Sequence, residues 1–280
     1  MPKASERQLE AAARAAFPDP KQRTVVFDFE GRRYVAKRLA ERPRKLVQTL
    51  FMHWLVKRIT GQPLPMKTLA LSEAAKSVDF EVNRLQTLAA SGVRIPRVAL
   101  KSADFFVLDH CGTVVATLLE TWPRETWRHE LLQLAEELGE FHRAGHWHGG
   151  AQIKNITQRH GENYRIDFEE NFGNFLPLAI TQLNDLLIFL NSISLAGPID
   201  QAEARDLLPQ LLNRYFAAHP SDEIKELIGR LLPLMRTLAR LVRPFQHGSK
   251  KGIRRILILV DVLREFEETC KPKIGHQAEG

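Results

Sequence analysis

Two kinds of hydrophobic pattern divide this chain of 280 residues, and their order limits the architecture that it can adopt. In residues 24–39, TVVFDFEGRRYVAKRL, β-forming residues flank Glu30-Gly31, which predicts a β-hairpin. The stretches RIPRVAL and DFFVLDHC predict two further strands, both before Gly112. The strand signals are therefore concentrated in the early part of the chain.

Apolar residues recur at helical spacing over 44–60 and 72–90, and then through most of the chain after residue 112. The later helices are expected over 127–142, 180–195, 203–218, 221–245 and 250–268. Strands first and helices after predict an α+β chain. We expect a small mixed N-terminal lobe over 1–111, which includes the helix at 44–60, and a larger helical lobe over 112–280.

Composition and cysteine content indicate the compartment in which the protein is found. A hydrophobic content of 44% with 26% charged residues is typical of a folded soluble protein. Cys111 and Cys270 fit no metal-binding spacing and are expected to be free thiols in a reducing compartment. The N-terminus lacks a secretory apolar run, and no window reaches the ~18 apolar residues of a membrane span. These features predict a cytoplasmic protein.

The net charge of +7 indicates an anionic partner. Charge alone does not distinguish a nucleotide from a nucleic acid or a lipid headgroup. A nucleic-acid role ranks last, because the sequence lacks the combination of stacking aromatics and basic residues that such modules use.

Four separated polar residues together match the needs of phosphoryl transfer. Lys37 lies on the return strand of the hairpin, and Glu81 lies on the helix before Gly92. Asn155 ends HGGAQIKN, and Asp167 follows the strand-like YRI. Phosphoryl transfer needs a cation at the phosphates, an acid to hold that cation, and oxygen ligands for magnesium. The four residues supply each of these.

This set resembles the protein-kinase-like superfamily, and most closely its bacterial lipopolysaccharide-kinase and small-molecule phosphotransferase branches. VAK is similar to the kinase lysine motif, and Glu81 matches the glutamate that pairs with that lysine. ELGEFHRAGHWHGGAQIKN resembles the catalytic-loop segment, and IDFEE occupies the place of the magnesium motif, with Glu169 instead of glycine. LNDLLIFL, with Asp185, looks like the helix whose aspartate supports the catalytic loop. The resemblance spans residues 24–195.

The resemblance implies a two-lobed kinase-like fold that uses ATP and Mg2+. Lys37, held by Glu81, would contact the phosphates, and Asn155 with Asp167 would hold magnesium. The hinge-like LDHCG would contact adenine through the backbone of three residues: Asp109, His110 and Cys111. The acceptor implied by these branches is a hydroxyl on a sugar or a lipid-linked glycan, at the inner face of the membrane.

The sequence departs from the family pattern in its catalytic loop and in its hairpin. The family's catalytic aspartate falls at Gly150, two residues after His148, and the hairpin holds only one glycine, Gly31. A positioned base contributes ~10²–10⁴ in rate, so its loss favours a pseudokinase that acts as a nucleotide-sensing or membrane-associated adaptor. The leading interpretation remains an ATP-dependent phosphotransferase, which needs another proton acceptor, for which His148 and Asp167 are the candidates.

A third departure is the length of the interval between Lys37 and Glu81, which is wider than is usual in the family. The additional residues include the helix expected at 44–60. This helix has one apolar face that includes Trp54, and basic residues flank it. Cationic amphipathic helices lie at anionic lipid surfaces, so peripheral membrane contact is one interpretation. Packing against its own domain is the other, and it is the more common case.

Each candidate also has a purely structural interpretation. Lys37 and Glu81 are of residue types that are usually solvated, and Asn155 and Asp167 are of types that favour caps and turns. His142 and His146, with His148, have no cysteine near enough to complete a zinc site. HGG is also typical of a turn that needs positive φ at Gly149 and Gly150.

Overall fold

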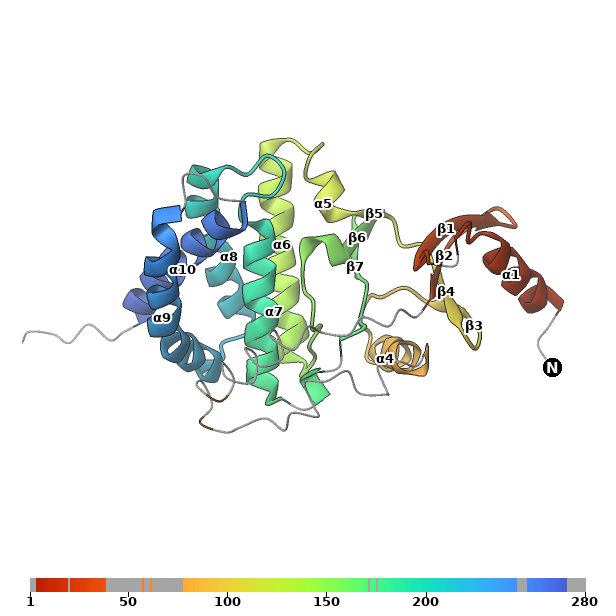
Figure 1. The fold of residues 1–280 in the computed structure, drawn as a ribbon, viewed down its shortest axis with the longest axis horizontal. Coiled ribbons are helices and arrows are strands. Elements are labelled where there is room, and N and C mark those ends of the chain that lie inside the picture. Colours follow the sequence, from red (N-terminus) through yellow and green to blue (C-terminus); the bar gives the residue numbers. More distant parts are fainter. Residues whose placement is uncertain are drawn as a thin grey trace, which may run out of the picture. The chain divides into compact units, whose positions relative to one another are not determined.

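The computed structural model describes residues 4–19, 21–38, 57, 61, 78–170, 172–174, 176–245 and 251–270. Two compact units divide the chain (Figure 1): unit 1 comprises Met1–Leu118 with His148–Pro177, and unit 2 comprises Leu119–Trp147 with Leu178–Gly280. The segment His148–Pro177 thus groups with the N-terminal residues, whereas the lobe boundary at residue 111 stays a prediction. The expected helix at 44–60, with Trp54, lies outside the described residues.

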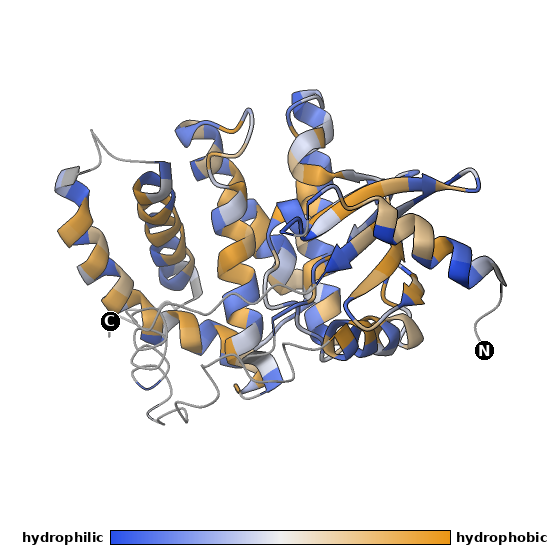
Figure 2. Cartoon of the chain, turned by 45° about the vertical axis from the view of Figure 1, so that its right-hand side comes forward, coloured by the Kyte–Doolittle hydropathy of each residue, from blue (hydrophilic) through white to orange (hydrophobic). Residues whose placement is uncertain are grey.

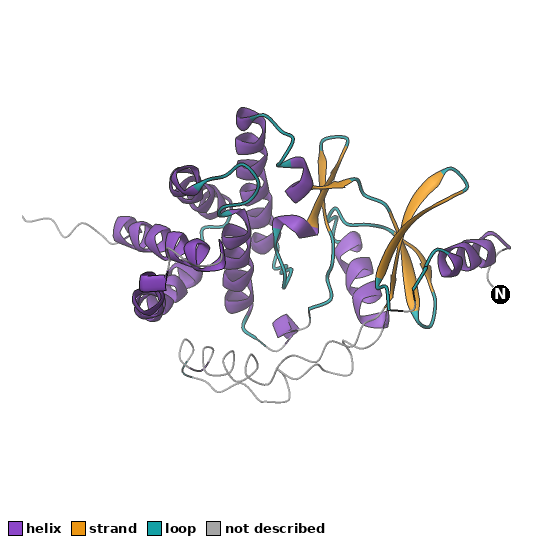
Figure 3. Ribbon diagram, turned by 45° about the horizontal axis from the view of Figure 1, so that its top comes forward, coloured by secondary structure: helices purple, strands orange, loops and turns teal. Residues whose placement is uncertain are grey.

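Unit 1 begins with a helix and a four-stranded antiparallel sheet in the order β1-β2-β4-β3 (Figure 3). Their bounds are α1 Ala4–Ala15, β1 Thr24–Phe29, β2 Arg32–Arg38, β3 Val98–Lys101 and β4 Phe105–Asp109. The predicted hairpin is confirmed: Glu30 and Gly31 form its turn with φ of 48° and 72°. A two-residue turn with both φ positive matches the right-handed twist of the paired strands.

The two faces of this sheet contact different helices. On one face, Tyr34 and Ala36 of β2 pack with Leu9 and Ala13 of α1 in a hydrophobic cluster. Successive side chains of a strand point to opposite faces, so Lys37 points away from α1. On the opposite face, α4 (Val78–Ala90) packs against β3 and β4. Only its residues from Val78 onward are described, so the start predicted at residue 72 is not tested.

Unit 1 also contains a three-stranded antiparallel sheet in the order β5-β6-β7. Its elements and the short helices beside it are β5 Thr113–Val114, α5 Val115–Leu118, η2 Ile153–Asn155, β6 Ile156–Arg159, β7 Glu162–Arg165 and η3 Phe172–Asn174. Gly112 has a φ of 96°, and a Cβ there would lie 2.0 Å from the carbonyl oxygen of Gln158. Only glycine allows the chain to approach β6 this closely before it pairs as β5.

Unit 2 is helical, as the periodicity predicts (Figure 1). Its elements are α6 Arg124–Arg143, α7 Leu178–Ile193, α8 Gln201–Ala218, α9 Asp222–Val242, η4 Arg243–Phe245 and α10 Lys251–Cys270. Asp200 accepts a hydrogen bond from Glu203 N–H at 2.8 Å, and Ser221 accepts one from Ile224 N–H at 3.3 Å. These two side chains cap the starts of α8 and α9.

The core of unit 2 depends on one close contact between helices. A Cβ at Gly139 of α6 would lie 2.7 Å from both Ala218 Cβ and Tyr215 O of α8. Glycine therefore allows α8 to lie directly against α6. At this contact, the buried ring of His142 shares a 2.7 Å hydrogen bond with the Tyr215 hydroxyl and lies 3.5 Å from Asp185. The packing of α6, α7 and α8 thus surrounds a buried polar group.

The α+β class predicted from the order of patterns is confirmed: an antiparallel N-terminal sheet precedes a largely helical remainder. The strands β5 and β6 were not predicted, because each is short, and the early helix α1, of 12 residues, was not predicted either. The described helices include none that is long and apolar enough to cross a membrane. Figure 2 shows apolar and hydrophilic residues alternating along the helices.

Candidate functional site

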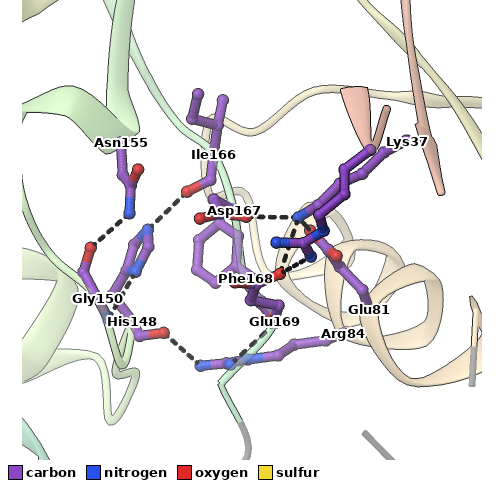
Figure 4. Close-up of polar contacts among 11 residues, drawn as sticks. Lys37, Glu81, Arg84, His148, Gly150, Asn155, Ile166, Asp167, Phe168 and Glu169 are labelled. Carbon is purple, nitrogen blue, oxygen red and sulfur yellow. Dashed lines mark hydrogen bonds and ion pairs between the residues drawn. The ribbon is translucent and has the colours of Figure 1, made fainter. Parts of the chain in front are cut away.

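The candidate site is built wholly from unit 1, around the ammonium group of Lys37 (Figure 4). Lys37 lies on the central strand β2, opposite Phe106 of β4, and points to the face of the sheet where α4 packs. The buried residues of α4 recur at helical spacing, and Glu81 is one of them. A carboxylate in a buried helical stripe needs a cation, and Lys37 Nζ lies 2.8 Å from Glu81 Oε1.

Two further carboxylates from IDFEE contact the same cation. Lys37 Nζ donates a hydrogen bond to Asp167 Oδ1 and lies 3.8 Å from Glu169 Oε2. Glu169 also accepts a 2.6 Å hydrogen bond from Arg23, which lies just before β1. The cluster therefore holds three carboxylates and two cations, an excess of one negative charge. This excess suits the binding of a further cation.

The surroundings keep Lys37 charged. Burial alone would lower the pKa of Lys37, but the charges of Glu81 and Asp167 and its hydrogen bonds to both raise that pKa above the ordinary value. Burial would raise the pKa of Asp167, but Lys37 holds it below its usual range. Glu81 is more deeply buried, and burial raises its pKa despite Lys37. Lys37 and Asp167 are therefore a charged pair at neutral pH.

Asn155 and Asp167 are brought together by the pairing of β6 with β7. Ile156 pairs with Arg165 at the end of that ladder, and Ile166 N–H donates to Asn155 O at 2.9 Å. The residue after Ile166 is Asp167, whose φ is 70°. Aspartate adopts this left-handed conformation at a cost, and such backbone conformations cluster at functional sites. The turn redirects the chain so that the Asp167 carboxylate reaches Lys37.

His148 holds the loop 148–155 against the segment 166–168. Its Nε2 is 2.9 Å from Ile166 O, and its Nδ1 accepts a 3.1 Å hydrogen bond from Gly150 N–H. The ring is fully buried and lies over Phe168 with centroids 4.3 Å apart. Backbone groups therefore engage both ring nitrogens of His148. The catalytic role predicted for His148 stays a prediction, and it would require the ring to give up one of these bonds.

The second glycine of HGG does not have the backbone conformation expected of it. Gly149 has a φ of 91°, as predicted, but the φ of Gly150 lies outside the left-handed region, so that expectation was wrong. A Cβ at Gly150 would meet Asn155 Nδ2 at 3.5 Å and His148 Nδ1 at 3.9 Å, both ordinary contacts. Neither the backbone nor steric exclusion therefore requires glycine at the position where the family pattern has its catalytic aspartate.

Arg84 is a residue of this site that the sequence reasoning missed. It lies one turn after Glu81 on α4 and donates hydrogen bonds to His148 O at 3.2 Å, Phe168 O at 3.3 Å and Glu170 O at 2.7 Å. Its guanidinium also lies 5.2 Å from the centre of the Phe168 ring. One planar cation thus joins α4 to both loops of the site. The signal available in the sequence was its position three residues after Glu81, because residues at that spacing lie on the same side of a helix.

Arg84→Ala is expected to lower the free energy of unfolding by about 1.5–3 kcal/mol, because buried carbonyls lose a charged donor. Urea unfolding measures the change, and amide exchange at residues 166–170 should become faster. Arg33→Ala is the matched control: Arg33 pairs with Asp28 at 3.1 Å at the surface, and exposed pairs contribute about 1 kcal/mol or less. Equal losses in the two variants would contradict the bridging role of Arg84.

The predicted hinge residues lie at and just after the end of β4, a central strand of the first sheet. Asp109 N–H donates to Arg97 O at 2.9 Å, and His110 N–H donates to Arg33 O at 3.2 Å. The carbonyl of His110 accepts a 3.2 Å hydrogen bond from Arg159. The thiol of Cys111 is half-buried, and burial raises its pKa to about 11. Adenine contact by Asp109, His110 and Cys111 stays a prediction, and several of the backbone groups concerned already have protein partners.

The residues near Asp167 fit a magnesium ion that is completed by phosphate oxygens. Asn155 Nδ2 donates to Gly150 O at 2.9 Å, which leaves the amide oxygen Oδ1 as its acceptor atom. In the described parts of the chain, no group of three His, Cys, Asp or Glu residues is arranged to hold a metal. Mg2+ commonly binds one or two carboxylates together with substrate phosphates. The amide oxygen and the surplus carboxylate charge meet that requirement.

Comparisons with known proteins add little to this geometry. No family model matches the chain, and no curated protein matches it. Among solved structures, choline kinase LicA from Streptococcus pneumoniae aligns with a TM-score of 0.38 and 11% identity, over 94% of this chain and 100% of that one. A likeness at this level carries nothing about activity. The function has to be inferred from the contacts of the site.

Proposed function

We propose that this protein is an ATP-dependent phosphotransferase with a kinase-like site in unit 1. The observation that carries the proposal is the position of Lys37, a buried ammonium that contacts a helix carboxylate, Glu81, and a loop carboxylate, Asp167. Each of these residues comes from a different part of the sequence. A charged lysine held beside a candidate magnesium ligand is the arrangement that phosphoryl transfer requires.

The proposed roles follow from the atoms that each residue presents. Lys37 binds phosphate oxygens, and Glu81 holds its ammonium in place. Asn155 Oδ1 and the Asp167 carboxylate hold Mg2+, which when bound neutralises charge on the transferred phosphoryl group. The backbone at the hinge residues Asp109, His110 and Cys111 contacts adenine. The acceptor is a hydroxyl on a sugar or a lipid-linked glycan, and this part of the proposal is supported by the sequence resemblance alone.

The proton acceptor for the acceptor hydroxyl is the weakest part of the site. Gly150 supplies no carboxylate, and both ring nitrogens of His148 are engaged. Asp167 has a depressed pKa, which suits a metal ligand better than a base. Phosphoryl transfer depends mainly on positioning and charge stabilisation. Slow transfer without a strong base is therefore consistent with this site.

The second candidate function is a pseudokinase that senses nucleotide or serves as a membrane-associated adaptor. Gly150 favours it, and so does the engagement of Lys37 and Arg23 by carboxylates of the site itself. Turnover distinguishes the two functions. An enzyme hydrolyses ATP slowly without its acceptor, whereas a pseudokinase binds nucleotide without turnover or does not bind it.

Saturating ATP with Mg2+ is expected to raise the melting temperature by about 5 °C, the shift that ligand at ~100 times its Kd produces in a chain of this size. ATP without magnesium should give a smaller shift, and Asp167→Asn should remove the difference between the two conditions. Asp28→Asn, a change to an exposed carboxylate on β1, is the control and should behave as wild type. The metal assignment would be overturned if ATP raised the melting temperature equally with and without magnesium, and equally in wild type and in Asp167→Asn.

A further inference from the structure

The basic charge of this protein is concentrated in one segment of unit 2. Residues 227–260 contain eight lysines and arginines and no aspartate or glutamate, whereas the rest of the chain holds 32 basic and 33 acidic residues. The segment covers most of α9 and the first half of α10. The excess positive charge of the whole protein therefore lies in this segment, whereas acidic residues are found at the start of α9 and in the second half of α10.

The described basic side chains of this segment differ in whether they have a partner. Arg230 pairs with Glu226 at 2.6 Å, and Arg243 lies 3.6 Å from Asp261. No described carboxylate pairs with four other exposed residues: Arg236, Arg240, Lys251 and Arg254. Their charges are directed to solvent at the end of the helix pair, where they can attract an anionic partner.

Apolar side chains are exposed at the same end of the pair. Five large apolar side chains are exposed in the described part of the chain, and three of them belong to this segment: Leu238 at 40%, Leu241 at 65% and Ile256 at 45%. Leu238 and Leu241 are three residues apart and share one side of α9. A Cβ at Gly229 of α9 would lie 3.7 Å from Glu267 near the end of α10, and Arg243, just after α9, lies 3.6 Å from Asp261 farther back in α10, so the two helices run antiparallel. The end of α9 and the start of α10 therefore lie at the same end of this helix pair.

We propose that this end of the α9–α10 pair docks on an anionic membrane surface. Leu238, Leu241 and Ile256 would enter the boundary between headgroups and acyl chains, and the four arginines and lysines without carboxylate partners would contact lipid phosphates. Exposed apolar residues beside unpaired cations are the combination that interfacial binding requires. The exposed apolar residues here are aliphatic, whereas surfaces for single-stranded nucleic acid use aromatic stacking. The aliphatic character of these residues thus favours lipid over nucleic acid.

Vesicle flotation of the full chain tests this proposal. The protein should float with vesicles of phosphatidylcholine and phosphatidylglycerol, and not with vesicles of phosphatidylcholine alone. Arg236→Gln with Arg240→Gln should lower the partition coefficient about 25-fold, since each charge near the surface contributes about fivefold. Leu238→Gln with Leu241→Gln should lower it tenfold or more, at high salt as well as low salt.

Two controls make the result specific to this surface. Leu178→Gln changes an exposed leucine on α7 and should leave flotation unchanged, and Trp54→Glu tests the helix expected at 44–60. Flotation lost in Trp54→Glu and kept in the α9 variants would overturn the proposal. So would equal binding to neutral and anionic vesicles, or binding to a polynucleotide with none to vesicles. The test does not depend on turnover of ATP, because only lipid binding is measured.

Discussion

Gly150→Asp is expected to raise the rate of ATP hydrolysis by about 10²–10⁴, the range that a positioned base contributes. The structure can accept this change, because the backbone at Gly150 does not need glycine and the nearest atoms to a new Cβ are 3.5 Å away. The new carboxylate would stand beside Asn155, in the place of the base in the family pattern. Phosphate release from Mg-ATP without an acceptor measures the effect.

Gly150→Asn is the matched control, because its side chain has the same shape and cannot take up a proton. Its rate should remain at the wild-type level, while its melting temperature should match that of Gly150→Asp. Equal rates in both variants would show that a base at this position does not limit turnover. Absence of turnover in Gly150→Asp, with Mg-ATP still bound, would favour the pseudokinase alternative.

Lys37→Met is expected to lower the free energy of unfolding by about 3–5 kcal/mol, the usual cost of removing one partner from a buried ion pair. Glu81 is only 4% exposed, so its carboxylate would remain buried with no cation at hydrogen-bond distance. Asp167 is more exposed and can be solvated, so most of the loss is assigned to Glu81. Denaturant unfolding at neutral pH measures the change.

The double variant Lys37→Met with Glu81→Gln should recover much of that stability, because the buried charge is then removed as well. It should not recover nucleotide binding, since the cation for the phosphates is still absent. Arg97→Met is the control, because Arg97 pairs with Asp109 at 2.8 Å at the surface. This change should lower the free energy of unfolding by about 1 kcal/mol or less. A double variant no more stable than Lys37→Met would contradict the proposed role of Glu81.

Local sequence patterns predicted several parts of this fold well. The turn at Glu30-Gly31 and the strands around it follow from short-range chemistry, and so do the long helices whose apolar residues recur every three or four positions. The short strands were missed because prediction from local patterns needs a run of residues long enough to show a period. Strands such as Thr113–Val114 are stabilised by partners distant in sequence, and their own residues carry no distinct pattern.

The candidate site divides in a similar way. Lys37, Glu81 and Asp167 were chosen from the order and spacing of motifs, and the structure places their charged groups in contact. Arg23 and Glu169 were not foreseen as partners, because the motif pattern has glycine at position 169 and does not extend to position 23. The backbone of Gly150 was misjudged, because φ depends on how His148 and Asn155 hold the loop.

The sequence by itself determined the α+β class, the hairpin that carries Lys37, and the basic segment at 227–260, since each depends on residue types and spacing within a short stretch. The tertiary structure alone decided which charges meet around Lys37, that backbone groups engage both ring nitrogens of His148, and that a side chain fits at position 150. Those outcomes depend on contacts between distant segments. Such contacts are set by the packing of strands and helices, which a linear pattern does not specify.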